Sequence, residues 1–459
     1  MRLWTSDEIA LATGGSVSAE FEASGVTFDS REVGPGDLFL ALSGEATDGH
    51  RFLDQAFASG AAGAVVSCPT PHPHVLVHDT TAALDTLGIA ARGRMGGVVI
   101  GVTGSVGKTG TKEALFAALD RNDPGCAHRS VKSYNNHTGV PLSLARMPRT
   151  ARFGVFEMGM NHAGELAQLT RLVRPHVAMV TTIAPAHMGF FKDEAAIADA
   201  KGEIFEGLEP GGTAIVPFDS AHRDRLIAAA KSHAGRIVSF GIGEGADVRA
   251  IETMRTRTGG TFVTARLGDR ELSFTLSQPG AHWVSNAMGV LAAVDAAGGD
   301  LELAGLALAE LGGLPGRGAR LLVPAGGGEA LVIDESYNAN PASMRATLEV
   351  LAHETGRRIA VLGEMRELGA HSEAFHAELS GPIEAAGVDF AILVGEAMAP
   401  LANALEGHVD FVHVPDAATA RGRLEDVLAA GDAVLVKGSN GVRLSTIVAA
   451  LAERQPCST

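Results

Sequence analysis

The chain has 459 residues, more than one hydrophobic core usually organises, so two or three domains are expected. Hydrophobic residues make up 46% of it and charged residues 20%, a globular composition that leaves little room for long disordered segments. The 37 basic and 53 acidic residues leave a formal net charge of −16, which repels nucleic acid phosphates and anionic lipid. We therefore expect no nucleic acid partner.

The cysteines and the N-terminus indicate the compartment. Cys68, Cys126 and Cys457 are far apart and show no metal-binding spacing, which fits a reducing environment. Acidic residues interrupt the N-terminal stretch where a signal peptide needs apolar residues, and Thr5 and Glu8 predict a helix with a capping box instead. No apolar run approaches the roughly 20 residues of a membrane helix. A cytoplasmic protein without membrane insertion is expected.

The predicted elements divide the chain into three domains, at residues 1–95, 96–315 and 316–459. In the first domain short apolar runs alternate with turns, which predicts a small α/β unit without a complete catalytic set of its own. Its strand candidates lie within residues 25–42, 60–67 and 74–79. A Gly/Pro-rich joint, "GGLPGRGAR", separates the second domain from the third.

The second domain begins with an apolar run, Val98 to Val102, and helical periodicity follows from Lys112 to Leu119. Further buried-strand candidates lie within residues 152–159, 175–183 and 211–218. Strands that alternate with helices predict a mainly parallel sheet covered on both faces. Residues 245–277 alternate polar and apolar side chains around a Gly-Gly turn, which predicts an antiparallel insert.

The third domain repeats the alternation of buried strands and helices. Its strand candidates lie within residues 329–335, 357–364, 389–396, 408–414 and 432–439. This pattern predicts a second doubly wound α/β domain. The whole chain is therefore expected to be of the α/β class.

A phosphate-binding loop lies between the first strand and helix of the second domain, at Gly104, Ser105, Val106, Gly107, Lys108 and Thr109. Backbone N–H groups of the Gly-rich turn and the following helix N-terminus converge on one anion, and the lysine adds a charge. The Thr109 hydroxyl would serve Mg²⁺. Because Val102 stands where the commonest loop has glycine, a flexible turn with a solvated lysine is the alternative. The flanking strand and helix favour a nucleotide site, and we predict an ATP-consuming enzyme.

Two polar residues end other predicted strands of this domain. Glu157 lies at the sheet edge where open α/β sheets bind ligands, and His187 lies just past another strand end. Singly, Glu157 is most simply a carboxylate facing water and His187 a structural histidine, but beside the phosphate loop they favour a metal or phosphate site. Lys201 lies on a predicted helix, and its spacing alone indicates a solvated charge.

The third domain contributes a polar turn after its first strand candidate. Asp334 ends the strand, and Asn340 is expected to cap the next helix with Pro341 at the first helical position. Capping does not explain Asp334. It also does not explain Tyr337 and Asn338, which lie between Asp334 and Asn340. These side chains are therefore candidates for ligand binding.

Two further positions are candidates for binding an anion. Lys437 ends a predicted strand and precedes a Gly-Ser-Asn-Gly turn. Ser30 and Arg31 lie in a turn of the first domain, where Arg31 could hold a phosphate, although a surface arginine is the simpler interpretation.

Taken together, these segments resemble the Mur ligase family over essentially the whole chain. They occur in family order: "FDSREVGPGDLFLALSGEATDGHRF", "GVTGSVGKTGTKE", "NNHTGVPLSLARMP", "FEMGMNHAGEL", "APAHMGFF", "AKGEIFEGL", "GAHWVSNAMGVLAA", "DESYNANPASM", "LGEMRELG" and "VLVKGSNGVRL". Within the family the resemblance is to the member that joins D-alanyl-D-alanine to UDP-N-acetylmuramoyl-tripeptide. The motif "DNPR" of the sibling that adds diaminopimelate or lysine is absent.

The resemblance implies one domain that binds the UDP-sugar peptide, a central ATPase domain, and a C-terminal Rossmann-like domain that closes over both. It implies ligation through an acyl phosphate in cytoplasmic peptidoglycan precursor synthesis, with ADP and phosphate as products. ATP and two Mg²⁺ ions are the implied cofactors. The implied partners are the two substrates, UDP-N-acetylmuramoyl-tripeptide (UDP-MurNAc-tripeptide) and D-Ala-D-Ala, and a monomer is expected.

The resemblance also implies a role for individual residues. Lys108 matches the family's phosphate-loop lysine and Thr109 its Mg²⁺-binding hydroxyl, while Glu157 and His187 match ligands of a second Mg²⁺. Lys201 matches a lysine that carries CO₂ as a carbamate and helps to hold that metal, so it completes the implied catalytic set. Positions that match ATP contacts are Asn286, Arg317, Asp334, Tyr337 and Asn338. Positions on the path of the UDP-sugar peptide are Ser30, Arg31, Asn136 and Thr138.

Some features depart from the family pattern or bear on other functions. Val102 fits the family's shorter "TGxxGKT" loop, but Gly110 replaces a frequent second threonine and weakens the helix start by up to about 1 kcal/mol.

A sibling ligase or a folylpolyglutamate-type ligase is the alternative enzyme, and the complete first domain disfavours the folate branch. A nucleotide-dependent switch without ligation is the alternative outside enzymes, and the complete metal set disfavours it.

Overall fold

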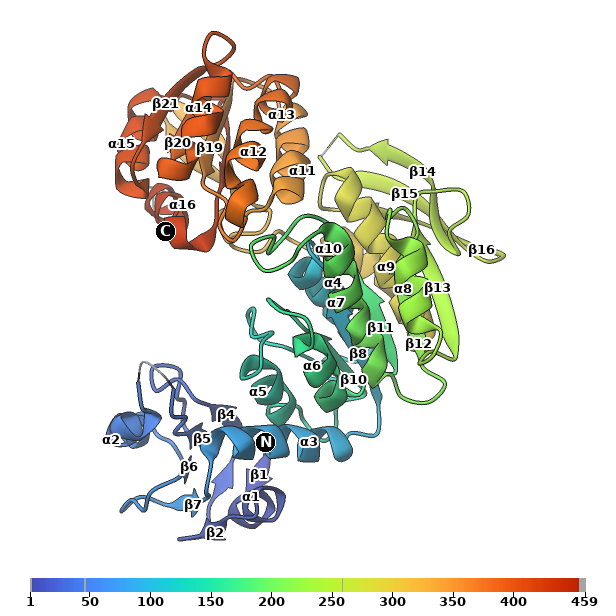
Figure 1. Ribbon diagram of the computed structural model, residues 1–459, viewed down its shortest axis with the longest axis vertical. Helices are drawn as coiled ribbons and strands as arrows, with labels where there is room; N and C mark the ends of the chain where they lie inside the picture. The colour runs from blue at the N-terminus through green and yellow to red at the C-terminus, as the bar shows by residue number, and fades with distance from the viewer. Residues whose placement is uncertain (1, 45–46, 258, 454–459) are drawn as a thin grey trace.

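The computed structural model describes residues 2–44, 47–257 and 259–453. Its strands form three large sheets and one short pair, and each large sheet belongs to a different part of the chain. Figure 1 shows the N-terminal sheet and its helices in blue at the bottom, the central sheet above and beside them, and the C-terminal sheet in orange and red at the top. The predicted α/β class with three domains is confirmed.

The N-terminal sheet has five strands in the order β2-β7-β6-β5-β4, of which β4 to β7 run parallel. The strands are β2 (Ser16–Val17), β4 (Gly25–Thr27), β5 (Asp37–Leu40), β6 (Gly63–Val66) and β7 (His74–Leu76), beside the pair β1 (Trp4–Thr5) and β3 (Glu22–Ala23). The helices are α1 (Ser6–Thr13), η1 (Gly49–Phe52), α2 (Leu53–Ala58) and α3 (Thr80–Gly93). The predicted capping box of Thr5 and Glu8 begins α1, and Gly14 ends it in the left-handed region.

The central sheet has nine strands in the order β16-β15-β14-β13-β12-β11-β8-β10-β9. They are β8 (Val98–Thr103), β9 (Ala127–Arg129), β10 (Phe153–Glu157), β11 (Val177–Val180), β12 (Thr213–Pro217), β13 (Arg236–Gly241), β14 (Val248–Arg255), β15 (Thr261–Leu267) and β16 (Arg270–Leu276). Strands β9 to β14 and β8 pair in parallel, whereas β14, β15 and β16 are antiparallel to one another. The expected antiparallel insert therefore extends one edge of the same sheet.

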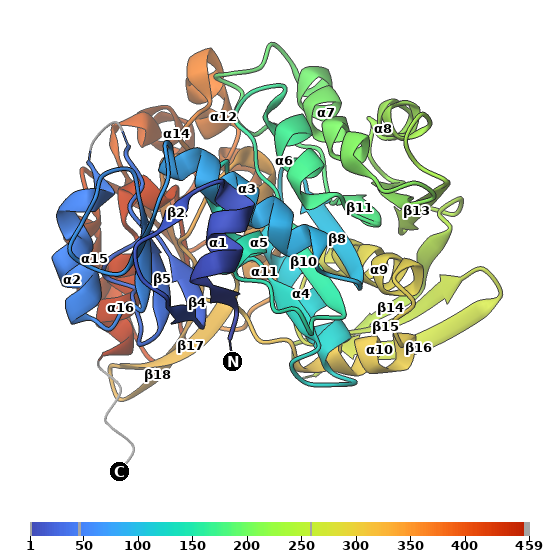
Figure 2. The same ribbon diagram turned by 90° about the horizontal axis from the view of Figure 1, so that it is seen from below.

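Helices cover both faces of the central sheet, as its parallel strands require. They are α4 (Lys108–Asp120), α5 (Gly139–Ala145), α6 (Glu165–Val173), α7 (Glu194–Gly202), η2 (Glu203–Gly207), α8 (Arg223–Ala230), α9 (Ala281–Ala296) and α10 (Leu301–Glu310). Successive residues of β8 face opposite sides: Ile100 packs with α4 and α9, and Val99 with α5 to α8. Figure 2 shows these two groups of helices on opposite sides of the sheet.

The C-terminal sheet has six strands in the order β17-β18-β22-β19-β20-β21, and only β17 is antiparallel to its neighbour. The strands are β17 (Ala319–Ala325), β18 (Gly328–Glu335), β19 (Arg358–Gly363), β20 (Phe390–Val394), β21 (Asp410–Val414) and β22 (Ala433–Lys437). The helices are α11 (Pro341–Ala352), η3 (Gly369–His371), α12 (Ser372–Ala377), α13 (Ser380–Ala385), η4 (Glu396–Met398), α14 (Ala399–Leu405), α15 (Ala417–Val427), η5 (Asn440–Val442) and α16 (Ser445–Ala452). Pro324 lies in the edge strand β17, where proline is tolerated. That strand was not predicted.

Strand ends of two sheets position the site. The chain leaves β8, β10 and β11 of the central sheet, and β18 and β22 of the C-terminal sheet, toward one shared pocket. Parallel strands bring their carboxyl ends to a single sheet edge, so each sheet supplies one wall. Among the described residues, no helix is long and apolar enough to cross a membrane.

Candidate active site

The phosphate loop lies between β8 and α4, and its glycines are required by close approaches. A Cβ atom on Gly104 would lie 1.9 Å from Thr181 Oγ1, and one on Gly107 would lie 2.8 Å from Asn286 Nδ2. Both glycines have positive φ, +150° and +87°. Thr181 Oγ1 also donates to the Val106 carbonyl at 2.6 Å, so β11 supports the loop from behind. The loop is thereby held in one conformation at the start of α4.

Lys108 folds back over this loop. Its Nζ donates to the Gly104 carbonyl at 2.7 Å. Burial lowers the pKa of Lys108, the carboxylate of Glu157 raises it, and the Arg317 guanidinium lowers it. The ammonium therefore lies within the field of groups from both walls of the pocket.

Glu157 is buried at the end of β10, so the alternative of a carboxylate facing water is wrong. Thr109 Oγ1 donates to its Oε2 at 2.8 Å, and Asn135 Nδ2 donates to its Oε1 at 2.7 Å. The Glu157 backbone N–H donates to Ser130 Oγ at 3.2 Å. These hydrogen bonds fix the Glu157 carboxylate beside the first turn of α4, in contact with the Thr109 hydroxyl.

His187 lies in the loop after β11 and contacts the C-terminal domain. Its Nδ1 lies 2.6 Å from Glu367 Oε2, and the Gly189 backbone N–H donates to the Glu367 carbonyl at 2.9 Å. His187 and Glu367 both have positive φ, +58° and +65°, a conformation that costs non-glycine residues energy and needs surrounding support. Within the described part of the chain, Nε2 of His187 has no hydrogen-bond partner, and His187 lines the pocket.

Lys201 is almost fully buried in α7, so the expectation of a solvated charge is wrong. Its ammonium has no hydrogen bond or ion pair among the residues that the structure describes. Burial lowers the pKa of Lys201 well below its usual value, and the nearby charge of Lys108 lowers it further. Lys201 does not line the pocket itself.

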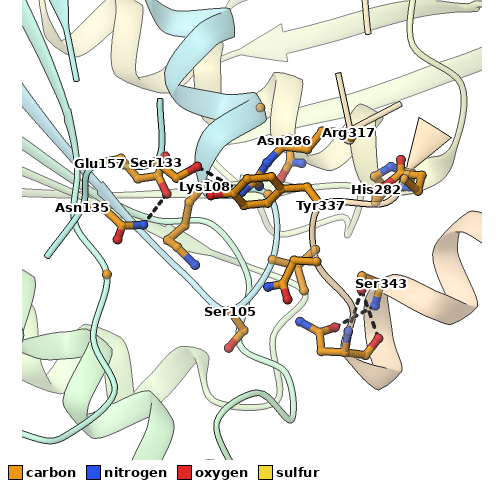
Figure 3. A pocket seen from close by; sticks show the side chains of 18 of the residues that line it. Ser105, Lys108, Ser133, Asn135, Glu157, His282, Asn286, Arg317, Tyr337 and Ser343 are labelled. Atoms are coloured by element: carbon orange, nitrogen blue, oxygen red, sulfur yellow. Dashed lines mark hydrogen bonds between the residues drawn. The ribbon is translucent and has the colours of Figure 1, made fainter. Parts of the chain in front are cut away.

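The pocket between the central and C-terminal domains has a volume of about 280 Å³. Of the predicted site residues, those that line it are Ser105, Val106, Gly107, Lys108, Glu157, His187, Asn286, Arg317, Tyr337, Asn338 and Lys437. Figure 3 shows Lys108 and Asn286 near its centre, Glu157 and Asn135 on one side, and His282 on the opposite side. The structure therefore brings residues from distant segments into one elongated site.

The C-terminal wall is a charged cluster. Lys437 Nζ donates to the Asn338 carbonyl at 3.0 Å and lies 3.6 Å from Glu335 Oε2. The Arg317 guanidinium lies over the Tyr337 ring, 4.3 Å from its centroid. Burial raises the pKa of Glu335 and lowers the pKa of Lys437. The positive charge of Lys437 partly opposes the rise for Glu335, and the negative charge of Glu335 partly opposes the fall for Lys437.

Asp334 is buried behind this wall and does not line the pocket. Its Oδ2 accepts from the Gly316 N–H at 2.7 Å, and its Oδ1 accepts from the Ser336 N–H at 3.1 Å and the Ser336 hydroxyl at 2.6 Å. In this structure its carboxylate orders the joint between the domains. The predicted cap is confirmed, because Asn340 begins α11 with Pro341 at its start.

The predicted UDP-sugar-peptide residues lie outside the pocket. Arg31 is exposed and pairs with Asp29 at 2.6 Å, an interaction that lowers the pKa of Asp29 to about 2. Ser30 Oγ donates to Gln55 Oε1 at 3.3 Å. Asn136 Oδ1 accepts from the Thr138 hydroxyl at 3.1 Å, just before α5. Asn136 and Thr138 thus contact each other, but among the described residues neither is hydrogen-bonded to Ser30 or Arg31.

Sequence reasoning missed several lining residues and one contact. The missed lining residues are Ser133, Asn135, Gly159, Met160, Asn161, His282, Trp283, Gly316, Glu335 and Ser343, and the missed contact is Glu367. Asn135 precedes a predicted residue and Glu335 follows one, so the local motifs could have indicated both. Glu367 meets His187 only through the packing of two domains, for which the sequence carried no local signal.

Comparison with known proteins agrees with this arrangement. Residues 22–91 match the Mur ligase family catalytic domain, 102–294 the Mur ligase middle domain, and 320–440 the Mur ligase glutamate ligase domain. UDP-N-acetylmuramoyl-tripeptide–D-alanyl-D-alanine ligase of Escherichia coli K12 is 35% identical over 444 residues, covering 96% of each chain. The chain belongs to the Mur ligase family.

Solved structures show the same similarity. MurF from Acinetobacter baumannii has a TM-score of 0.84 and 33% identity over 98% of this chain and 99% of that one. MurF ligase from Thermotoga maritima, solved in complex with ADP, has a TM-score of 0.77 and 26% identity over 94% of this chain and 97% of that one. The three-domain arrangement of this chain is therefore that of known MurF structures.

Proposed function

We propose that this chain joins D-Ala-D-Ala to UDP-MurNAc-tripeptide, forming a peptide bond while ATP becomes ADP and phosphate in peptidoglycan precursor synthesis. The observation that carries this function is the shared pocket, in which Lys108 of the phosphate loop lies with Glu157 and His187 and faces the C-terminal wall. Full-length similarity to ligases named for this reaction supports the same substrates.

The chemistry requires activation of a carboxylate. A carboxylate resists attack by an amine, so the terminal carboxylate of the tripeptide first attacks the γ-phosphorus of ATP and ADP leaves. The D-Ala-D-Ala amine then attacks the acyl carbon, and phosphate departs with the former carboxylate oxygen. Catalysis of phosphoryl transfer rests mainly on positioning and on charge stabilisation, both of which this pocket offers.

On ATP binding, Lys108 would exchange its hydrogen bond to the Gly104 carbonyl for one to a phosphate of ATP. Its Nζ donates to the Gly104 carbonyl in the structure, and a bound phosphate would offer it a stronger, charge-assisted hydrogen bond. The loop N–H groups and the α4 N-terminus would bind the same phosphates. Arg317 and Lys437 add positive charge from the opposite wall.

Thr109, Glu157 and His187 suit Mg²⁺ as a donor set. A hydroxyl and a carboxylate lie together, and Nε2 of His187 has no hydrogen-bond partner among the described residues. No group of three or more His, Cys, Asp or Glu that could hold a metal occurs in the described ranges, so protein ligands would be few, as Mg²⁺ commonly accepts. We assign Thr109 to one ion, and Glu157, His187 and Lys201 to a second. Bound Mg²⁺ would offset the phosphate charge.

Lys201 is proposed to carry CO₂. Its buried ammonium has no hydrogen bond or ion pair among the described residues, and the lowered pKa of Lys201 favours the neutral amine. A neutral amine adds to CO₂, forms an N–C bond and releases one proton. The resulting carbamate has oxygen atoms that can face Mg²⁺, which an ammonium cannot do.

The remaining predicted residues are assigned to binding. For ATP these are Gly104, Ser105, Val106, Gly107, Asn286, Arg317, Tyr337 and Asn338, with Asp334 holding their wall in place. For the UDP-sugar peptide these are Ser30, Arg31, Asn136 and Thr138. We assign residues 1–95 to that substrate, 96–315 to ATP, and 316–459 to the domain that closes over both and excludes water from the acyl phosphate.

We also propose a cytoplasmic monomer. A composition with few cysteines fits a reducing compartment, where the nucleotide substrates are available. The pocket is lined by residues of one chain, so no second copy is needed to complete it.

The test is phosphate release and product mass with ATP, Mg²⁺ and defined substrate pairs. UDP-MurNAc-tripeptide with D-Ala-D-Ala should give one phosphate per ligated product, and omission of either should reduce release to background. Ligation of diaminopimelate or lysine to UDP-MurNAc-dipeptide would indicate a sibling ligase instead. Glutamate addition to a folate would indicate the folylpolyglutamate reaction, and ATP binding without any product would indicate a switch.

A further inference from the structure

Trp283 lies on the pocket wall in the first turn of α9, and its indole packs on the phosphate-loop helix. A Cβ atom on Gly110 would lie 2.9 Å from Trp283 Cη2 and 3.1 Å from its Cζ2. A side chain at position 110 would therefore displace the indole. This contact gives a physical reason for the glycine at this helical position, because the ring needs the space.

The indole is half-buried and lines the same pocket as the phosphate loop. A tryptophan with one supported face and one exposed part is suited to stack on a flat aromatic ligand. The edge of the ring lies against Gly110 of α4. The stacking surface is thus fixed relative to Lys108, only two residues before Gly110.

The neighbour His282 is neutral, although the charge of Lys437 acts on it. Burial, with a smaller effect from the Lys437 charge, lowers the pKa of His282 to about 4, so its imidazole is neutral near pH 7. In the described ranges the His282 ring has no hydrogen-bond partner. A neutral ring that can donate and accept hydrogen bonds suits a neutral base better than a phosphate.

The order of the side chains along the pocket matches the order of the groups in a nucleotide. Figure 3 shows His282 on the side of the pocket opposite Glu157 and Asn135, with Lys108 and Asn286 between them. If the loop holds the phosphates at Lys108, the base has to reach away from Glu157. The end formed by His282 and Trp283 is the aromatic end of the pocket.

We propose that Trp283 recognises the adenine base of ATP by stacking, with Gly110 serving as the seat of its indole. The inference rests on the proposed function, because it takes ATP as the substrate of this pocket. Lys108 is then assigned to the phosphates and Trp283 to the base, and both lie at the start of α4.

Fluorescence tests the proposal because the chain has only two tryptophans. The other, Trp4, is buried in the N-terminal domain, where its Nε1 donates to the Ala145 carbonyl at 2.9 Å. In Trp4→Phe, Trp283 is the only tryptophan, and excitation at the red edge, where tyrosine does not absorb, keeps the two tyrosines out of the signal. ADP should change its emission severalfold more than tripolyphosphate, which fills the phosphate loop but carries no base. Equal responses to both ligands, or no response to bound ADP, would overturn the proposal.

The complementary variant guards against a folding defect in Trp4→Phe. In Trp283→Phe, Trp4 is the only tryptophan, and under the same red-edge excitation its emission should not respond to ADP. Calorimetry should give a dissociation constant for ADP within about threefold of wild type for Trp283→Phe and about tenfold or more weaker for Trp283→Ala. Unchanged ADP affinity in Trp283→Ala would overturn the inference.

Failure of the proposed function gives a different result. If wild-type protein binds neither ADP nor ATP by calorimetry, the assignment of the pocket to ATP is wrong. If ADP binds but Trp283 does not respond, the ATP site stands and only the role of Trp283 is wrong.

Discussion

The two walls of the nucleotide pocket are built in different ways. The central wall comes from one sheet edge, where Thr109, Glu157 and Asn135 are joined by hydrogen bonds of 2.7–2.8 Å within one domain. The C-terminal wall faces it from another sheet, and its relation to the first wall depends on contacts between domains, such as the 2.6 Å contact of His187 with Glu367.

Because of this difference, substitutions in the two places should have different kinetic effects. A wall held within one domain keeps its geometry whether or not the C-terminal domain moves, whereas an interdomain contact can be lost by a rigid-body motion. Substitutions in the central wall should therefore abolish the chemical step. Substitutions between the walls should mainly change affinity or metal dependence.

Lys108→Ala should have the largest effect, because it removes the charge that faces the phosphates from the phosphate loop. Ligation should fall by at least about two to three orders of magnitude. The measurement is single-turnover ADP formation with both substrates saturating, with circular dichroism to check folding. Near-normal turnover in a folded variant would remove Lys108 from the mechanism.

Lys201→Ala should come close to this loss, because the proposed carbamate would no longer hold the metal. Ligation should fall about a hundredfold or more, and added acetate should restore part of it by supplying a carboxylate. A ¹³C signal from labelled bicarbonate should appear in wild type and disappear in the variant. Full activity of Lys201→Ala would show that the buried amine has no role in catalysis.

Glu367→Ala should have a smaller effect that is specific to the metal. Glu367 holds Nδ1 of His187, which leaves Nε2 for a metal, an arrangement common among metal-binding histidines. We expect the Mg²⁺ concentration for half-maximal ligation to rise severalfold, with less change at saturating Mg²⁺. The matched control is Glu373→Ala, which alters an exposed carboxylate at the start of α12.

An unchanged Mg²⁺ curve in Glu367→Ala would show that the interdomain contact does not orient His187. Glu367→Gln keeps an acceptor for Nδ1 and should lie between wild type and the alanine variant. If glutamine and alanine gave equal losses, the negative charge rather than the orientation of His187 would be the important property.

His282→Asn should have the smallest effect, and its pH dependence is measured through stability. The folded-state pKa of His282 is lowered from 6.5 to about 4, so below pH 6.5 the unfolded chain takes up a proton that the folded chain refuses. Wild type should therefore lose stability relative to the variant as pH falls from 7 to 5. Urea unfolding at several pH values measures this, with the exposed His233→Asn as control. Parallel curves for wild type and His282→Asn would contradict it.

The sequence predicted the features that depend on local order. A buried strand, a glycine turn and Lys-Thr follow one another within twelve residues, so hydrophobic burial and helix-terminus electrostatics define the phosphate loop locally. The alternation of strands and helices likewise predicted the parallel sheets. The strand β17 was missed because proline and flanking glycines mask its alternating pattern.

Features that depend on tertiary packing were out of reach. Lys201 is a plausible surface lysine by its helical spacing, and tertiary packing is what buries it. The contact between His187 and Glu367 requires the orientation of two domains. From the sequence, Gly110 was expected only to weaken the start of α4. The structure shows that the Trp283 indole occupies the space beside it.

The transfer of oxygen from substrate to phosphate tests the account most directly. UDP-MurNAc-tripeptide would carry ¹⁸O in both oxygens of its terminal carboxylate, and ligation would be run with ATP and D-Ala-D-Ala in unlabelled water. The account predicts one ¹⁸O in each phosphate released and one in the new amide, because the carboxylate oxygen that attacks phosphorus leaves with it. Phosphate without label, formed together with the ligated product, would contradict activation of the carboxylate in this pocket.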